Sequence, residues 1–510
     1  MHRRILNPCP PRRRGRPLAA RLALLGAGLL IAACGDPEPV EIPVYEDAAC
    51  RFALAGDQVE GQTVSCGDLL VPENRDVPEG PELRIHFARF HSEVDGAPTV
   101  LLTGGPGSAS TTLVEAVDAQ MAQTLTATGD FIFFDQRGVG ASMPTLDCPE
   151  VLSFFQPLDD PSAYGAAYAA AVSPCAQRLT EEGHDLTAYN TQANADDVED
   201  LRLALELDQV NLVGVSYGAR LALEIMRRHP DGLRAVVLDA VPAPQFVWPY
   251  EAGANFEDAL FRLFDACAAD TGCSNAYGDL EVKVVEAIAA MNASPLVLPN
   301  LQVPLPGNDF SVLLINFLYQ RLTYANIPAI VDAAHRGDAA AFEGLYLQML
   351  AAFPDPGEPP AFGMQFSMLC HGAVRYADEQ ELMDAYTDVT PELGAAIKAT
   401  FSDTLYELCA DWPVGPADAS LLTPVSSAVP TLVLNGEYDP VTPMRYGHEA
   451  ADTLSQSFVV DFPDSGHGIS IGSPCGLDVR QAFLQDPTVQ PDTSCVDSLA
   501  FDFALPAPTP

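Results

Sequence analysis

Ser216 lies at the centre of a short segment that could carry out acyl transfer. Residues 214–218 read GVSYG, a G-x-S-x-G pattern. A serine hydroxyl is a weak nucleophile, so it needs a base beside it and a tight turn that exposes its oxygen. Glycines on both sides of the serine permit such a turn, because side chains there would collide. The pattern predicts a catalytic serine, and the alternative is an ordinary tight turn.

A base and an acid that could activate this serine come later in the chain. His467 follows an apolar run at residues 458–462, and Asp439 follows another at residues 431–434. Ligand sites in open α/β sheets form at the carboxyl ends of strands. A histidine there would take the serine proton, and a carboxylate would orient the histidine. Two other acids lie in the same loops, Glu437 as a rival of Asp439 and Asp464 as a weaker one.

The oxyanion formed during acyl transfer needs N–H donors that are already in place. One donor is expected from Tyr217, the residue after the serine. The other is expected from the loop at residues 103–107, which reads TGGPG and follows an apolar run. Glycines would let this loop approach the substrate carbonyl, and the alternative is a plain turn.

Alternating strands and helices are expected to position these residues. Apolar runs predict buried strands at residues 98–102, 131–135, 210–213, 235–239, 430–434 and 458–462. Helical spacing of apolar residues separates several of them, as at residues 193–207. The alternation predicts an α/β fold with a mostly parallel sheet and helices on both faces.

The pattern changes after residue 242. Residues 243–428 contain helical stretches and proline-rich connections but no run of buried strands, so we expect an inserted helical cap there. The core is expected to comprise residues 50–242 and 429–500. Residues 34–49 are rich in proline and acid and are interpreted as a tether.

The N-terminus has the composition of an export signal. Residues 1–33 are rich in arginine and lack acids, and an apolar run at residues 22–33 precedes Cys34. That run is too short to span a membrane and fits a cleaved signal peptide. Residues 31–35 are similar to a bacterial lipobox, in which Cys34 is lipidated and becomes the new N-terminus. Plain secretion is the alternative.

The cysteines favour disulfide bonds. Of 12 cysteines in 510 residues, Cys9 lies in the signal and Cys34 is the lipidation candidate. An even number remains, which in an exported chain is typical of a disulfide framework. Proximity favours the pairs Cys50–Cys66, Cys148–Cys175, Cys267–Cys273, Cys370–Cys409 and Cys475–Cys495. No cysteine spacing supports a zinc site, and we expect neither a metal nor a cofactor.

The chain is strongly acidic, with a formal net charge of −43. This charge argues against a nucleic acid partner. It could attract amine-bearing substrates, although a solvated acidic surface is the simpler interpretation.

Five segments carry a further signal when taken in order. They are TGGPG at 103–107, FDQRGVGAS at 134–142, GVSYGARLALEIMRRHP at 214–230, NGEYDPVTP at 435–443 and SGHG at 465–468. Together they resemble the proline iminopeptidase and tripeptidyl aminopeptidase branch of the α/β-hydrolases, across about residues 50–495. The resemblance implies the α/β-hydrolase fold with a helical cap. It also implies these roles: Ser216 as nucleophile, His467 as general base and acid, Asp439 as its orienter, and Gly104 and Tyr217 as oxyanion donors.

Two positions depart from the pattern of these relatives. Thr103 stands where many have histidine, and Cys370 is followed by His371-Gly372 where an acid is expected. Enzymes that cut from a free N-terminus need a carboxylate to pair with the α-ammonium group, so the second departure bears on specificity. Other acids could serve, and the sequence does not select among Glu251, Asp258 and Glu407. Residues 135–137, DQR, match a family motif that we interpret as a buried network bracing the loops beside the serine.

These observations predict an exported, lipid-anchored serine hydrolase. The favoured activity is that of an aminopeptidase, which releases single residues or short peptides from free peptide N-termini through an acyl-enzyme. A carboxylesterase with the same triad is the alternative, and a non-catalytic binding protein on a hydrolase fold is a remote one. A serine nucleophile argues against epoxide hydrolase or dehalogenase chemistry, which uses aspartate there. The expected partners are peptide or ester substrates, with membrane contact through the lipid only.

Overall fold

The computed structural model describes residues 43–506, apart from 153–163, 352–358, 373 and 375–377. The chain divides into two units, residues 1–41 and 42–510, and the described residues belong to the second. The predicted signal peptide, Cys34 and the first part of the predicted tether lie outside the described residues. Among the described helices, none combines the length and the apolar character needed to cross a membrane.

A nine-stranded sheet forms the centre of the described unit, in the order β1-β2-β3-β5-β4-β6-β7-β10-β11. Strands β5, β4, β6, β7, β10 and β11 run parallel, and β1, β2 and β3 extend the sheet in antiparallel fashion. The strands are β1 (Val44–Ala48), β2 (Val64–Pro72), β3 (Glu82–Phe90), β4 (Thr99–Leu102), β5 (Phe131–Phe134), β6 (Val210–Val215), β7 (Leu233–Asp239), β10 (Thr431–Gly436) and β11 (Ser457–Phe462). The mostly parallel sheet predicted from the sequence is therefore present.

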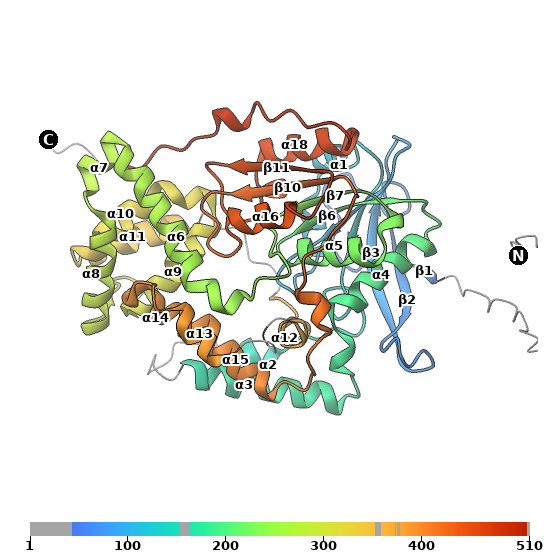
Figure 1. Cartoon of the computed structure of the whole chain (residues 1–510), viewed down its shortest axis with the longest axis horizontal. Coiled ribbons are helices and arrows are strands. Elements are labelled where there is room, and N and C mark those ends of the chain that lie inside the picture. The colour runs from blue at the N-terminus through green and yellow to red at the C-terminus, as the bar shows by residue number, and fades with distance from the viewer. Residues whose placement is uncertain (1–42, 153–163, 352–358, 373, 375–377, 507–510) are drawn as a thin grey trace, which may run out of the picture. The chain divides into compact units, whose positions relative to one another are not determined.

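Both faces of the sheet are buried because successive strand residues point to opposite sides. In β7, Val236 and Leu238 join one core and Ala235 and Val237 join the other. The first core is covered by α4 (Thr191–Ala204), α5 (Tyr217–Arg228) and α16 (Met444–Ala451). The second is covered by α1 (Ala119–Leu125), α17 (Ile469–Gly472) and α18 (Pro474–Gln485). Figure 1 shows α16 and α18 on opposite sides of β10 and β11.

Strand β1 lies within residues 34–49, the segment interpreted as a tether. It pairs antiparallel with β2 along its whole length. Four of its five side chains are exposed. A strand that buries almost no side chain leaves no apolar pattern in the sequence, and its pairing depends on the tertiary position of β2.

Between β7 and β10 the chain forms a series of helices, which we call the inserted helices. They are α6 (Trp248–Ala269), α7 (Thr271–Tyr277), α8 (Leu280–Ala293), α9 (Gly307–Tyr319), α10 (Ile327–His335), α11 (Ala339–Leu350), α12 (Phe362–His371), α13 (Glu379–Ala385), α14 (Pro391–Ile397) and α15 (Thr404–Asp411). A short hairpin, β8 (Leu296–Val297) and β9 (Pro304–Leu305), interrupts them. Helices α6 to α11 build an apolar core of their own beside the sheet (Figure 1). Helix α12 instead packs against the sheet core through Phe366 and Met368. Two further helices precede α4, α2 (Pro149–Leu152) and α3 (Tyr164–Glu181).

Five disulfide bonds join the pairs predicted from the sequence, so that prediction is confirmed. They are Cys50–Cys66, Cys148–Cys175, Cys267–Cys273, Cys370–Cys409 and Cys475–Cys495. Disulfides of this number are typical of exported proteins.

The segment after α18 connects the sheet side of the molecule with the inserted helices. Cys495 is bonded to Cys475 of α18. Further on, Phe501 packs edge-on against Tyr324, and the N–H of Ala504 donates to the carbonyl oxygen of Ala325 at 2.8 Å. The tail is therefore attached at both ends.

Candidate active site

Ser216 occupies a sharp turn between β6 and α5. Its backbone has φ 58° and ψ −125°, a conformation with positive φ that is uncommon for a residue with a side chain. A Cβ atom on Gly218 would overlap the carbonyl oxygen of Leu102, and one on Gly214 would overlap the backbone of Gly218. Side chains are therefore excluded on both sides of the serine. This strand–turn–helix geometry is the one in which a serine hydroxyl is held out for reaction.

His467 and Asp439 are in direct contact. Nδ1 of His467 lies 2.8 Å from Oδ2 of Asp439. The buried carboxylate of Asp439 also accepts hydrogen bonds from the N–H of Val441 and from the N–H and hydroxyl of Thr442, at 2.9, 2.9 and 2.6 Å. A carboxylate held by so many donors keeps a fixed orientation and orients the imidazole in turn.

The two rival acids point elsewhere. Glu437 pairs with Arg262 at 3.4 Å, and the carboxylate of Asp464 pairs with Arg321. Asp439 is therefore the one of the three that contacts His467. Its position at the end of β10 was the signal that favoured it in the sequence.

The surroundings of His467 favour its protonated form. Burial lowers the pKa of the imidazole. The charge and hydrogen bond of Asp439, together with the charge of Asp239, raise it by more than burial lowers it, so the pKa of His467 lies above its ordinary value. Burial raises the pKa of Asp439. The positive charge and hydrogen bond of His467, together with the hydrogen bonds from Thr442, lower it by more, so the pKa of Asp439 lies below its ordinary value. Asp439 is thus ionised at the pH at which His467 gains or loses its proton.

Asp239 ties the serine turn to the histidine loop. Its carbonyl oxygen accepts the N–H of Ser216 at 2.9 Å. Its buried carboxylate accepts the N–H groups of Ile469 and Ser470 at 3.0 and 2.6 Å, just after His467. Among the described residues the hydroxyl of Ser216 makes no hydrogen bond, and His467 contacts Asp439 and Tyr319. Catalytic hydrogen bonds often tighten only when substrate is bound.

The loop after β4 comes directly over the serine. A Cβ atom on Gly104 would lie 2.7 Å from Cβ and 3.2 Å from Oγ of Ser216, so only glycine allows this approach. Tyr217 is the first residue of α5, where the backbone N–H has no acceptor within the helix. Within the described part of the chain, neither the N–H of Gly104 nor that of Tyr217 donates a hydrogen bond. Among the described residues both N–H groups are therefore without an acceptor.

A buried network braces this loop, as the DQR motif suggested. The amide of Gln136 donates to the carbonyl oxygen of Thr103 at 3.1 Å. Asp135 accepts the N–H groups of Ser110 and Thr111 at 2.7 and 3.0 Å, which fixes the far end of the same loop. The guanidinium group of Arg137 makes its own buried contacts deeper in the core.

Ser216 opens into a cavity of about 380 Å³ between the sheet and the inserted helices. Apolar side chains make up much of its wall, among them Phe246 from the sheet side and Leu369 and Phe401 from the inserted helices. Among the described residues that line it, Arg220 is the one with an ionic side chain. The cavity would hold a substrate of a few residues.

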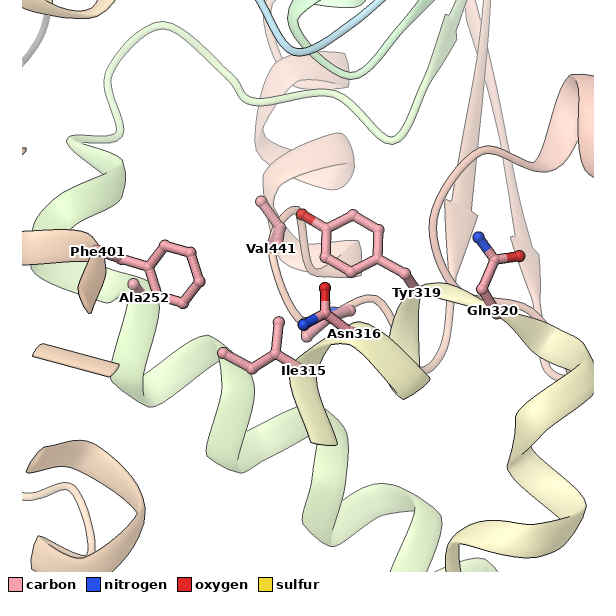
Figure 2. A pocket seen from close by; sticks show the side chains of 8 residues that line it. Ala252, Ile315, Asn316, Tyr319, Gln320, Phe401 and Val441 are labelled. Atoms are coloured by element: carbon pink, nitrogen blue, oxygen red, sulfur yellow. The ribbon is translucent and has the colours of Figure 1, made fainter. Parts of the chain in front are cut away.

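A second hollow of about 280 Å³ shares part of this wall, namely Tyr319, Phe401 and Val441. Figure 2 shows Phe401 and Tyr319 on opposite sides of it, with Asn316 between them. The ring of Tyr319 also packs edge-on against His467, with 5.0 Å between the ring centres. Tyr319 thus stands where the second hollow, the first cavity and His467 meet.

One group of possible metal ligands occurs among the described residues, Cys148, Glu150 and Cys175. The two cysteines form a disulfide bond, and Glu150 pairs with Arg178 at 2.6 Å. A disulfide offers no thiolate, so this group is not suited to bind a metal ion.

Sequence reasoning missed several residues of the site. Asp239 ends a strand, as Asp439 nearly does, and this position was the signal that could have singled it out. Thr442 lies three residues after Asp439 in a turn, and aspartates in turns commonly accept hydrogen bonds from the residues that follow them. No pattern in the sequence distinguished Tyr319, because it reaches the site through the packing of a distant segment. Arg220 lies only four residues after Ser216, but nothing in the sequence sets it apart from the other arginines of the same helix.

The parallel sheet, the strained serine between β6 and α5 and the histidine–aspartate pair at the strand ends define a class of protein. The chain is a serine hydrolase with the α/β-hydrolase fold. Residues 98–267 match the family described as alpha/beta hydrolase fold, and residues 395–495 match the one described as TAP-like protein.

Similar proteins carry both peptidase and esterase names. The chain is 26% identical over 480 residues to serine protease Hip1 of Mycobacterium tuberculosis, covering 87% of this chain and 89% of that protein. It is 26% identical over 479 residues to tripeptidyl aminopeptidase of Streptomyces lividans, covering 86% of each. It is also 27% identical over 498 residues to carboxylesterase B of Mycobacterium tuberculosis, covering 93% of each.

Proposed function

We propose that Ser216, His467 and Asp439 form the catalytic triad, with the N–H groups of Gly104 and Tyr217 as the oxyanion hole. Oγ of Ser216 attacks the substrate carbonyl carbon and gives its proton to Nε2 of His467. The carbonyl electrons move onto the oxygen that faces the two N–H donors. His467 then passes the proton to the leaving group as its bond to carbon breaks, which leaves an acyl-enzyme. Water, deprotonated by His467, releases the acyl group and restores the serine.

The single observation that carries this proposal is the strained conformation of Ser216 beneath Gly104. A positive φ at a serine costs free energy and persists only where its surroundings impose it. Here two glycines and the bond to Asp239 impose it. The result exposes one hydroxyl to a cavity, which a purely structural turn does not require.

We propose further that the substrate is a peptide and that the enzyme releases residues or short peptides from its N-terminus. The names of two relatives, a serine protease and a tripeptidyl aminopeptidase, support a peptidase. Residues 243–428, taken as a cap, would close one end of the cavity, so that only a short N-terminal segment fits beyond Ser216.

The acids considered for binding the α-ammonium group are engaged elsewhere or lie apart from this cavity. Glu251 pairs with Arg445, and Asp258 pairs with Arg262 at 2.9 Å. Glu407 lines a different hollow, next to α3. Recognition of the N-terminus would therefore use hydrogen bonds to neutral groups in the described wall.

A carboxylesterase is the second candidate. The wall around Ser216 is largely apolar, and one relative that spans nearly the whole chain is named carboxylesterase B. Esters need less assistance to the leaving group than amides, so the same triad would serve.

One experiment tests the triad and separates the two activities. A fluorophosphonate should label Ser216, and Ser216→Ala should abolish labelling and turnover. Aminoacyl and tripeptidyl p-nitroanilides, each with free and acetylated N-termini, are then compared with p-nitrophenyl esters. A preference for free N-termini supports the peptidase. Ester hydrolysis without anilide turnover, or indifference to acetylation, favours the esterase, and labelling at another serine refutes the triad.

We also propose that the protein is exported and anchored through a lipid on Cys34, after removal of residues 1–33. The five disulfides support export. Mass spectrometry of the intact protein from its native membrane fraction should give a chain that begins at a diacylated Cys34. An unmodified chain that begins elsewhere would contradict the lipid anchor.

A further inference from the structure

Arg220 lies one helical turn beyond Ser216 on α5. Its backbone N–H donates to the carbonyl oxygen of Ser216 at 3.3 Å, and both residues line the same cavity. Residues four apart lie on the same face of a helix. The guanidinium group donates to the carbonyl oxygen of Leu421, which lines the same cavity, so it lies on the cavity side of α5.

The charge of Arg220 has no acidic partner among the described residues. Its Nη2 donates only to the carbonyl oxygens of Pro244 and Leu421, at 3.3 and 3.2 Å. The nearest carboxylate along the helix, Glu224, is paired with Arg227 at 2.9 Å. Glu224 therefore acts on Arg220 only from a distance, and Arg220 has no direct ion pair among the described residues.

This cation stands in surroundings that strengthen its attraction for an anion. Burial lowers the pKa of Arg220 from its ordinary value, yet an arginine side chain stays charged in proteins. Neighbours such as Phe246 and Leu405 contribute apolar wall and little screening. A charge in such a wall attracts an opposite charge far more strongly than one on the surface does.

We propose that Arg220 binds a carboxylate of the substrate and so selects acidic substrates. This inference rests on the proposed acyl transfer at Ser216. The carboxylate has two possible sources. One is an acidic side chain on the residue that is released, and the other is the free C-terminus of a short peptide whose remainder leaves. A guanidinium group with unused N–H donors suits either source, because it can bind both oxygens of a carboxylate.

Two matched pairs of compounds test the two sources. Diphenyl phosphonates of Ala-Ala-Glu and Ala-Ala-Gln measure the acyl side through the rate at which Ser216 is labelled. A pentapeptide with a free C-terminus and the same peptide as its amide measure the leaving side through kcat/KM. In the wild-type enzyme the charged member of at least one pair should react about tenfold faster or more, as expected when a site is built to pair with one group.

Variants then assign the preference to Arg220. Arg220→Met should reduce the charged-to-neutral ratio to about one and change the rate of the neutral compound much less, whereas Arg220→Lys should keep part of the ratio. The matched control is Arg228→Met, since Arg228 lies on the same helix and pairs with Asp196. That variant should leave the ratio unchanged.

Three results would overturn the inference. They are no preference in either pair for the wild type, a preference that survives Arg220→Met, and an equal loss for charged and neutral compounds in both Arg220 variants. The last would make the arginine a structural clamp between α5 and Leu421. Failure of a simple fluorophosphonate to label Ser216 would instead refute the proposed function, so the two failures are distinguishable.

Discussion

The backbone carbonyl of Asp239 accepts the N–H of Ser216, while its carboxylate holds the segment that follows His467. One buried residue thus fixes the serine turn and the histidine loop relative to each other. Its negative charge also adds to that of Asp439 in favouring protonated His467. The consequences can be measured as a pH dependence.

The pH at which the enzyme becomes active should lie above the ordinary histidine pKa of about 6.5. Only neutral His467 can accept the serine proton, and its raised pKa keeps it protonated to a higher pH. A plot of kcat/KM against pH should therefore rise through an inflection above 6.5. An unperturbed histidine would instead give an inflection at about 6.5.

Removing the charge of Asp239 should move this inflection to lower pH. Asp239→Asn eliminates one of the negative charges that favour the imidazolium form. The control is Asp452→Asn, an exposed position at the end of α16, which should leave the inflection in place. An inflection at or below about 6.5 in the wild type, or an upward shift in the Asp239 variant, would contradict this account.

The glycine after Tyr217 should not tolerate even a methyl group. In Gly218→Ala the new Cβ would overlap the carbonyl oxygen of Leu102, so we expect a loss of about 1–3 kcal/mol in the free energy of unfolding and slower labelling of Ser216. The control is Gly344→Ala in the exposed part of α11, where no atom lies within 4 Å of the added carbon. It should raise stability by about 0.5–1 kcal/mol. Urea unfolding followed by circular dichroism measures both, and equal effects would refute the argument.

Arg137 should be among the most costly side chains to remove. Its guanidinium group is fully buried, with two bonds of 2.7 Å to Asp197 and two to backbone carbonyl oxygens. Arg137→Met leaves Asp197 partly unpaired in the core, so we expect a loss of about 3–5 kcal/mol in unfolding free energy.

The matched control for Arg137 is Arg84→Met. Arg84 pairs with Glu46 at 2.7 Å on the surface, and exposed pairs contribute only about 0–1 kcal/mol. Guanidinium chloride titrations of the two variants should therefore differ widely in midpoint. Similar midpoints would show that the buried network does not carry the stability assigned to it.

A chain that begins at Gly35 should contain no free thiol. All cysteines after that residue are paired in the five disulfides. Thiol titration in denaturant should give none before reduction, and reduction should lower stability by about 2–4 kcal/mol per bridge. The fully reduced chain provides the control for complete access of the reagent. Two or more thiols before reduction would contradict the pairing.

The parts of the fold that the sequence revealed are those with local chemistry. The serine turn was visible because glycines must flank it, and β6 and β7 because both their faces are buried and their residues are almost all apolar. The cysteine pairs followed from short separations along the chain. In each case the cause lies within a few residues of the effect.

The parts that escaped prediction depend on segments far apart in sequence. Strand β1 exposes most of its side chains, so its pairing with β2 left no pattern. The role of Asp239 depends on the hydrogen bonds that its carboxylate accepts from Ile469 and Ser470, which are 230 and 231 residues away in the sequence. In the sequence Arg220 looks like any other arginine of a helix. Its position depends on the carbonyl oxygens of Pro244 and Leu421, which accept its hydrogen bonds from other segments.

The attachment of the C-terminal tail at both ends limits how far the inserted helices can swing away from the sheet. From Cys495 to Phe501 the chain can span at most about 20 Å when fully extended, so the tail is a short tether between its two attachment points. Reduction of Cys475–Cys495 would lengthen this tether by residues 486–495, because the free segment would then start at the end of α18 and no longer at Cys495. How far the cavity around Ser216 can open would then depend on the redox state of the compartment. The inserted helices would move least where the Cys475–Cys495 disulfide is intact.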